Sequence, residues 1–295
     1  MVPLALLILI AGELAVYTTG AHYFLDASCG TAIVFACGAI LGLRAGIVAV
    51  TWAFAWTYRS PARILSTGAT LRMIVGEYLA FLLLFVCILP FERLWMGPDR
   101  LRQSTRPLLL VHGYGCSRGV WWLLRKQLEA AGHTVATLSL SPPYTSIGKL
   151  VPQLERRIEE VCRATGADQV VLIAHSMGGL VSRSYLARNG RARVERLITI
   201  SSPHAGSELA RLGFGQNARE MEPGSLWLTD LAHEAVKVPF FSIRTPHDNY
   251  VMPQDNQRLP EAEDIELPAL GHMSTLFTPR TFKAIMACFG KSKQS

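Results

Sequence analysis

The sequence predicts two parts: an all-α transmembrane segment of about three helices, followed by an α/β domain built on a compact, mostly parallel six-stranded sheet. Two observations predict this division. Up to about residue 90 almost every residue is apolar, small or hydroxylated, whereas charged residues occur at ordinary globular frequency from residue 91 onward. Beyond residue 106, short apolar runs alternate with segments of helical periodicity, as in a parallel sheet flanked by helices.

Three apolar stretches in residues 1–91 are close to or above the roughly 20 residues that a helix needs to cross a bilayer. We expect spans at about residues 2–24, 29–58 and 73–89. A secretory signal peptide is the alternative for the first stretch. A signal peptide begins with a basic segment, however, and no Lys or Arg precedes this apolar run. We therefore interpret residues 1–91 as a transmembrane helical region.

Three formally charged side chains lie inside these spans: Glu13, Arg44 and Glu77. Each would cost about 3 kcal/mol if it faced lipid at the centre of the bilayer. A buried Glu–Arg–Glu cluster that packs the helices together avoids this cost. A transport path is the alternative, but three spans are few for a transporter.

The placement of arginine predicts the orientation in the membrane. The connector at residues 20–28 contains Asp26 and no Lys or Arg, whereas the next connector contains Arg59, Arg63 and Arg72. Basic short loops are retained in the cytoplasm. We therefore expect an integral protein of a bacterial inner membrane with the C-terminal domain on the periplasmic side. The arginines that follow the third span oppose this orientation.

The remaining composition excludes several classes of partner. The net charge is +7, but no basic run is interleaved with aromatic residues, so we expect membrane lipids and no nucleic acid as partners. The six cysteines form no C-x-x-C or metal-like grouping. We therefore expect no disulfide framework, no metal and no cofactor, and the oligomeric state is not predicted.

A polar linker at residues 92–106 separates the spans from a single domain at residues 107–295. The strands of this domain are predicted from mostly apolar runs at 107–111, 134–140, 170–174, 196–201, 238–244 and 264–267. Apolar residues at helical spacing predict helices at about 120–131, 150–161, 180–186 and 279–289. The last helix opens with Thr278 and Pro279, an N-cap followed by proline at the first helical position.

The segment V-L-I-A-H-S-M-G-G at 171–179 places Ser176 at the turn between a predicted strand and a helix. Such a turn lifts the hydroxyl above the sheet, and small neighbours prevent collisions. Ala174 replaces the first glycine of G-x-S-x-G but is small enough to keep the turn. The helix N-terminus also favours negative charge developing near the serine. Ser176 is therefore the candidate nucleophile.

A serine hydroxyl needs an adjacent base that is oriented by an acid. With a nucleophile at a turn of this type, the chain order is serine, acid, histidine. His272 follows the last predicted strand, and Asp248 lies in the loop after the penultimate strand. These are the candidate base and acid, with Asp255 and then Asp230 as alternatives for the acid. Supporting roles are expected for the histidines at other motifs: His112, His175, His204 and His247.

These motifs resemble the small bacterial triacylglycerol lipases and esterases of the α/β-hydrolase superfamily. The resemblance rests on V-H-G-Y-G, A-H-S-M-G-G, S-P-H-A-G-S, D-N-Y-V and G-H-M, within about residues 107–289. It implies an α/β-hydrolase fold and hydrolysis of acyl esters through an acyl-serine intermediate. The implied roles are catalysis for Ser176, Asp248 and His272, and an oxyanion hole formed by the main-chain N–H groups of Tyr114 and Met177. The membrane spans lie outside the family pattern.

The resemblance leaves the cap and the exact reaction open. Residues 208–237 lie where the family carries a cap, and they are apolar enough either to line an acyl pocket or to cover an ordinary core. No carboxylate cluster requires the calcium that some of these lipases bind. Acyltransferases, thioesterases and phospholipases use the same triad, so the sequence does not separate them from a lipase. A catalytically inactive membrane scaffold is the alternative from another class.

Overall fold

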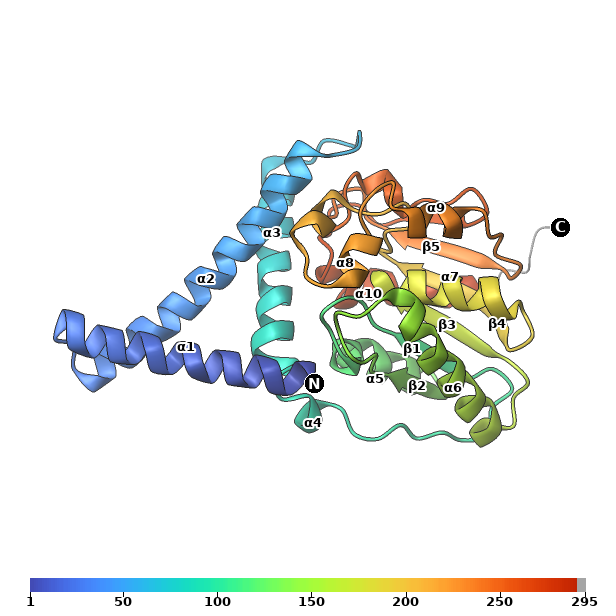
Figure 1. Cartoon of the computed structure of the whole chain (residues 1–295), viewed down its shortest axis with the longest axis horizontal. Coiled ribbons are helices and arrows are strands. Elements are labelled where there is room, and N and C mark those ends of the chain that lie inside the picture. The colour runs from blue at the N-terminus through green and yellow to red at the C-terminus, as the bar shows by residue number, and fades with distance from the viewer. Residues whose placement is uncertain (291–295) are drawn as a thin grey trace.

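The computed structural model describes residues 1–290 and places three long helices beside an α/β domain (Figure 1). The helices are α1 (Val2–Leu25), α2 (Cys29–Thr57) and α3 (Thr67–Leu82), and α3 continues into a π-helical turn, η1 (Leu83–Ile88). By length and composition, all three are able to cross a membrane. The third begins at Thr67 rather than at residue 73, because Ser66 caps it by accepting a hydrogen bond from the N–H of Ala69.

The three helices do not form a parallel bundle. The turn between α1 and α2 lies far from the α/β domain, and α3 runs along the domain (Figure 1). Arg44 of α2 forms an ion pair with Glu13 of α1 at 2.6 Å, with both side chains largely buried. Glu77 faces the α/β domain instead and bonds to residues 273 and 274. The predicted cluster of three charges is therefore wrong, because Glu77 and the Glu13–Arg44 pair have different partners.

The α/β domain contains a single six-stranded sheet with the order β2-β1-β3-β4-β5-β6, and all five strand pairs are parallel. Its strands are β1 (Leu108–Val111), β2 (Val135–Leu138), β3 (Val170–His175), β4 (Val194–Ile200), β5 (Phe240–Arg244) and β6 (Glu263–Glu266). Each lies within about two residues of a predicted strand. The predicted fold class is confirmed.

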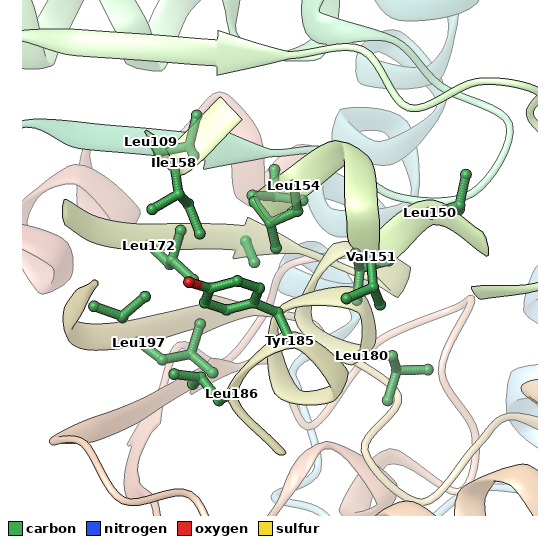
Figure 2. Packing of buried hydrophobic residues seen from close by; sticks show 14 of the residues in the cluster. Leu109, Leu150, Val151, Leu154, Ile158, Leu172, Leu180, Tyr185, Leu186 and Leu197 are labelled. Carbon is green, nitrogen blue, oxygen red and sulfur yellow. The ribbon is translucent and has the colours of Figure 1, made fainter. Parts of the chain in front are cut away.

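Helices cover both faces of this sheet, and each face has its own core. The main ones are α5 (Trp122–Ala130), α6 (Ile147–Thr165), α7 (Met177–Asn189) and α10 (Pro279–Phe289). On one face Leu154 and Ile158 of α6 pack with Leu109 and Leu172 of the strands and Tyr185 of α7 (Figure 2). The other core contains apolar residues of α5 and α10 together with residues of α3 and η1. The third helix is therefore part of the core of the α/β domain.

The predicted linker is bound to the domain rather than free. It begins with the short helix α4 (Glu92–Trp95), and the carboxylate of Glu92 accepts hydrogen bonds from the hydroxyl of Ser117 and the N–H of Gly119. The buried carboxylate of Asp99 accepts from the N–H of Thr137 at 2.7 Å and pairs with Arg157 at 2.6 Å. These contacts fix the connection between the helices and the domain.

Residues 208–237 form three short helical segments: η3 (Glu208–Leu212), α8 (Gln216–Glu220) and α9 (Leu226–Ala232). Their apolar side chains Met221, Leu228 and Leu231 belong to the core on the α6 and α7 face. This region therefore covers an ordinary hydrophobic core, which is one of the two roles that the sequence left open.

Candidate active site

Ser176 lies at a sharp turn between β3 and α7. Its backbone has φ 54° and ψ −129°, a positive φ that non-glycine residues rarely adopt. Strain of this kind persists where the surrounding structure holds it, and it is common at functional sites. The geometry is that of a nucleophile elbow, in which the serine stands at the top of the sheet.

Glycines allow the chain to pack closely around Ser176. A Cβ on Gly178 would lie 2.3 Å from the carbonyl oxygen of Val111, and one on Gly179 would lie 2.3 Å from Oγ of Ser202. A Cβ on Gly113, in the loop after β1, would lie 2.7 Å from Cβ of Ser176. Side chains at Gly113 and Gly178 would therefore separate the loop after β1 from Ser176 and α7, and one at Gly179 would separate α7 from Ser202.

The structure brings Asp248 and His272 together. Nδ1 of His272 lies 3.0 Å from both carboxylate oxygens of Asp248, and both side chains are almost completely buried. The Asp248 carboxylate also accepts hydrogen bonds from the N–H groups of Tyr250 (2.7 Å) and Val251 (2.9 Å). These donors hold it as an acceptor, so that Nδ1 carries the proton and Nε2 is free to act as a base.

The alternative acids lie elsewhere. Asp255 pairs with Arg258 at 2.8 Å, and its side chain is 49% exposed. Asp230 is exposed on α9. Neither is hydrogen-bonded to His272, so the geometry favours Asp248 as the acid.

Two rings pack against the imidazole of His272. The ring of Tyr250 is stacked on it with centroids 5.0 Å apart, and the centroid of the His175 ring lies 4.6 Å from that of His272. Burial, and then the charge of His272, lower the pKa of His175 well below its usual value. His175 is therefore neutral at pH 7 and does not oppose a positive charge that forms on His272.

His112 anchors the loop after β1, as the sequence predicts. Its Nε2 accepts from the N–H of Leu140 at 2.9 Å, so its Nδ1–H donates to the carbonyl oxygen of Gly113 at 2.8 Å. Burial lowers its pKa to about 4, and it therefore stays neutral above that pH. The other two histidines also have structural partners: His204 bonds to Thr199, and His247 bonds to the carbonyl of Arg63.

One of the two predicted oxyanion donors belongs to the residue after Ser176, and the other belongs to the loop after β1. Met177 is the first residue of α7, where main-chain N–H groups have no acceptor within the helix. Tyr114 lies in the turn after β1, between Gly113 and Gly115. Its side-chain hydroxyl bonds to both the carbonyl oxygen (2.7 Å) and the N–H (2.8 Å) of Phe214 in the predicted cap. The side chain of Tyr114 thus joins this loop to the cap.

A cavity of about 860 Å³ contains both Ser176 and His272 in its lining. Part of its wall comes from the N-terminal helices, through the apolar side chains Leu6 and Leu9 of α1, Ile47 of α2, Phe81 of α3 and Phe85 of η1. Its lining includes no residue of 208–237. Sequence reasoning missed these helix residues because an apolar residue that lines a cavity looks like one that faces lipid.

The described residues suggest no metal centre. Within residues 1–290, no group of three or more His, Cys, Asp and Glu side chains is placed to hold a metal ion.

Comparison with known proteins identifies the fold family of this domain. Residues 106–222 match the α/β hydrolase fold family. A triacylglycerol lipase of Burkholderia plantarii is 35% identical over 145 residues, which are 46% of this chain and 40% of that protein. Another, from Pseudarthrobacter phenanthrenivorans, is 35% identical over 142 residues, which are 45% of this chain and 44% of that protein. The chain thus spans less than half the length of these curated relatives.

Solved structures show the same fold. The mature lipase BlEst2 of Bacillus licheniformis has a TM-score of 0.57 at 22% identity, covering 65% of this chain and 94% of that one. Aspergillus fumigatus lipase B has a TM-score of 0.55 at 18% identity, covering 60% of this chain and 51% of that one. The chain therefore contains an α/β-hydrolase-fold domain. In sequence, this domain is similar to bacterial triacylglycerol lipases.

Proposed function

We propose that this protein is a serine hydrolase that cleaves carboxylic acyl esters of lipids. The observation that carries the proposal is the buried Asp248–His272 pair, whose histidine lines one cavity together with Ser176 at a strained elbow. The similarity to triacylglycerol lipases supports the same reaction class.

The reaction follows from the roles of these residues. Oγ of Ser176 attacks the carbonyl carbon of the ester while Nε2 of His272 takes its proton. The main-chain N–H groups of Tyr114 and Met177 stabilise the oxyanion that forms. The C–O bond of the ester then breaks, and His272 gives the proton to the leaving alcohol. Water repeats the sequence on the acyl-serine and releases the carboxylic acid.

The wall of the cavity supports a lipid as the acyl donor. Its volume of about 860 Å³ is within the range of ligand pockets, about 300–1,000 Å³. Helix residues that belong to candidate membrane spans line it beside the nucleophile, and a long apolar chain would find apolar contacts there. A phospholipase, a thioesterase or an acyltransferase would use the same residues, and a panel of lipid esters, thioesters and alcohol acceptors distinguishes them.

Substitution of the nucleophile tests the proposal. Ser176→Ala is expected to abolish labelling by a fluorophosphonate probe and to lower turnover on the order of a millionfold, with the fold retained. Undiminished ester hydrolysis by the purified variant would falsify the assignment. Probe labelling and circular dichroism, measured on the full chain in detergent, separate a loss of chemistry from a loss of structure.

Two further variants assign the base and the acid. His272→Ala is expected to be as damaging as Ser176→Ala, and Asp248→Asn less so, because the acid orients the imidazole and does not react. Asp255→Asn is the matched control and is expected to be mild. The reverse result, a severe loss in Asp255→Asn with a tolerated Asp248→Asn, would assign the acid to Asp255.

We also propose that α1 and α2 anchor the chain in a bacterial inner membrane. Both helices expose large apolar side chains to their surroundings, among them Leu4, Ile8, Val16, Phe24, Val34, Phe35 and Trp56. An apolar surface of this extent is unfavourable in water and typical of contact with lipid. Membrane lipids are therefore the expected surroundings of these two helices.

Contacts at both ends of α3 help to decide on which side of the membrane the α/β domain lies. Before α3, Oγ of Ser60 accepts a hydrogen bond from the N–H of Asp255 at 2.9 Å. After η1, Leu89 is buried in the core of the α/β domain. The 22 residues of α3 and η1 extend about 33 Å, close to the thickness of the hydrocarbon core of a bilayer. A domain on one side of a membrane cannot contact both ends of a helix that crosses it.

We therefore favour a two-span arrangement, in which α1 and α2 cross the membrane and α3 lies along its surface. The exposed apolar face of α3, with Leu71, Val75 and Leu79, then faces the lipid. The domain lies on the side of Arg59 and Arg63, which the distribution of basic residues assigns to the cytoplasm. The three-span expectation gives the periplasmic side instead.

Protease treatment of spheroplasts with an intact inner membrane distinguishes these arrangements. Protection of the domain until detergent is added supports two spans and a cytoplasmic domain. Digestion of the domain in intact spheroplasts supports three spans and a periplasmic domain.

A further inference from the structure

The carboxylate of Glu77 bonds to the loop that carries the candidate catalytic base. Glu77 lies on α3 and is completely buried. Its Oε1 accepts a hydrogen bond from the N–H of Met273, and its Oε2 accepts one from the N–H of Ser274, both at 2.9 Å. These are the two residues that directly follow His272.

The residue before His272 is also fitted to Glu77. A Cβ on Gly271 would lie 2.5 Å from Oε2 of Glu77 and 2.6 Å from its carboxyl carbon. Only a residue without a side chain allows this approach. Glu77 therefore contacts the main chain on both sides of His272.

A second set of hydrogen bonds links the N–H of His272 to the N-terminal helices. It donates to Oδ1 of Asn249 at 3.0 Å, and Nδ2 of Asn249 donates to Oγ1 of Thr51 on α2 at 2.7 Å. Three consecutive main-chain N–H groups, at residues 272, 273 and 274, are thus bonded to α3 directly or to α2 through one side chain. The domain holds the imidazole through Asp248, and the N-terminal helices hold its backbone.

Packing of α3 on the domain does not require this carboxylate. Ala80, Leu84 and Ile88 on α3 and η1 already pack into the apolar core of the domain. Removing a carboxylate from water is unfavourable unless hydrogen-bond partners compensate for the lost solvation. A buried Glu whose two oxygens both bond to the residues after His272 suggests a role at that histidine.

We propose that Glu77 is a positioning residue, which fixes the main chain that carries His272 so that the imidazole stays on Asp248 and within reach of Ser176. The inference rests on the proposed serine hydrolase function. A helix predicted to be a membrane span thereby becomes part of the support of the active site. The domain without α3 would lack this constraint.

Glu77→Gln in the full chain tests the proposal. Glutamine can offer its oxygen to one N–H, but its NH₂ group then meets the other N–H. We expect kcat on a soluble ester to fall by about 10- to 100-fold, as for other small misplacements of catalytic groups, with KM unchanged. The rate of fluorophosphonate labelling is expected to fall in parallel, and Glu77→Ala should be more severe.

Glu13→Gln is the matched control, because it neutralises the other buried helix carboxylate. Glu13 pairs with Arg44 and bonds to no residue of the α/β domain in the described part of the chain. The control is expected to lower Tm while kcat stays at the wild-type value. A Glu77→Gln protein that behaves in the same way, with lowered Tm and normal kcat, would overturn the positioning role.

Gly271→Ala disturbs the same contact from the domain side. It replaces Glu77→Gln as the test variant if the Glu77→Gln protein does not fold. Because both changes act on one contact, the double variant should lose no more activity than the more damaging single variant. Additive losses would contradict the proposal. Ser176→Ala in the same assay distinguishes a failure of the proposed function from a failure of the proposed role of Glu77. Full activity of Ser176→Ala refutes the hydrolase function. An inactive Ser176→Ala protein together with a normal Glu77→Gln protein refutes only the role of Glu77.

Discussion

The N-terminal helices and the predicted cap at residues 208–237 both lie next to the candidate active site, but they contribute to it differently. The cap fills the core beside α7 and contacts the site at two points. The hydroxyl of Tyr114 bonds to the main chain of Phe214, and Nδ2 of Asn217 donates to Sδ of Met177. The N-terminal helices provide apolar lining next to Ser176, and two of their polar side chains hold the loop of His272. Part of the cavity wall therefore comes from the N-terminal helices and none of it from residues 208–237.

The difference shows that the cover of an active site need not follow its place in the chain. A segment inserted between two strands can pack as ordinary core, while a segment at the other end of the sequence closes the site. The apolar face of the cap packs on α7, whereas apolar side chains of α1, α2 and α3 line the cavity beside Ser176.

Among the variants that test this difference between the helices and the cap, the largest effect is expected from narrowing the cavity on the helix side. Leu6→Trp in α1 should lower kcat/KM for long-chain esters by about 100-fold, since a pocket discriminates strongly against chains that no longer fit. Acetyl esters should be hydrolysed normally. Ile8→Trp is the matched control, because Ile8 is 63% exposed and does not line the cavity. An equal loss for short and long esters would instead indicate that the variant is misfolded.

The sequence predicted the sheet more closely than it predicted the surroundings of the candidate site. Buried parallel strands read as continuous apolar runs, and the order serine, acid, histidine led to Asp248 and His272, which the structure joins by a hydrogen bond. Local patterns carry no information on long-range partners. Glu77 and Ser274 are far apart in the chain, and nothing around Glu77 distinguishes a loop partner from an ion pair with Arg44.

A smaller effect distinguishes the α/β domain from the N-terminal helices by pH. Burial lowers the pKa of His112 to about 4 from about 6.5, so the unfolded chain binds more protons than the folded domain between these values. The stability contributed by neutral His112 is therefore complete above pH 6.5 and is lost as the pH falls toward 4, by about 3 kcal/mol in total. The α/β domain should unfold in acid while the Glu13–Arg44 hairpin of α1 and α2 stays helical.

Urea titrations at several pH values, followed by circular dichroism and tryptophan fluorescence, measure this dependence. His112→Asn removes the titrating group and should flatten the dependence of unfolding free energy on pH between 4 and 6.5. An unchanged slope in this variant would show that other buried groups, such as His175 or His204, dominate the acid response.

The smallest effect is expected from the only side chain that joins the loop after β1 to the cap by hydrogen bonds among the described residues. Tyr114→Phe removes the bonds to both main-chain groups of Phe214, at a cost of about 1–2 kcal/mol of stability. The loop itself stays anchored by His112, and the proposed oxyanion donor is the main-chain N–H of Tyr114, which the substitution leaves in place. We therefore expect a lower Tm, a more mobile cap by hydrogen exchange, and a kcat close to wild type for both short and long esters. A selective loss on long-chain esters, like that of Leu6→Trp, would instead show that the cap takes part in binding the acyl chain and would remove the contrast between the two regions.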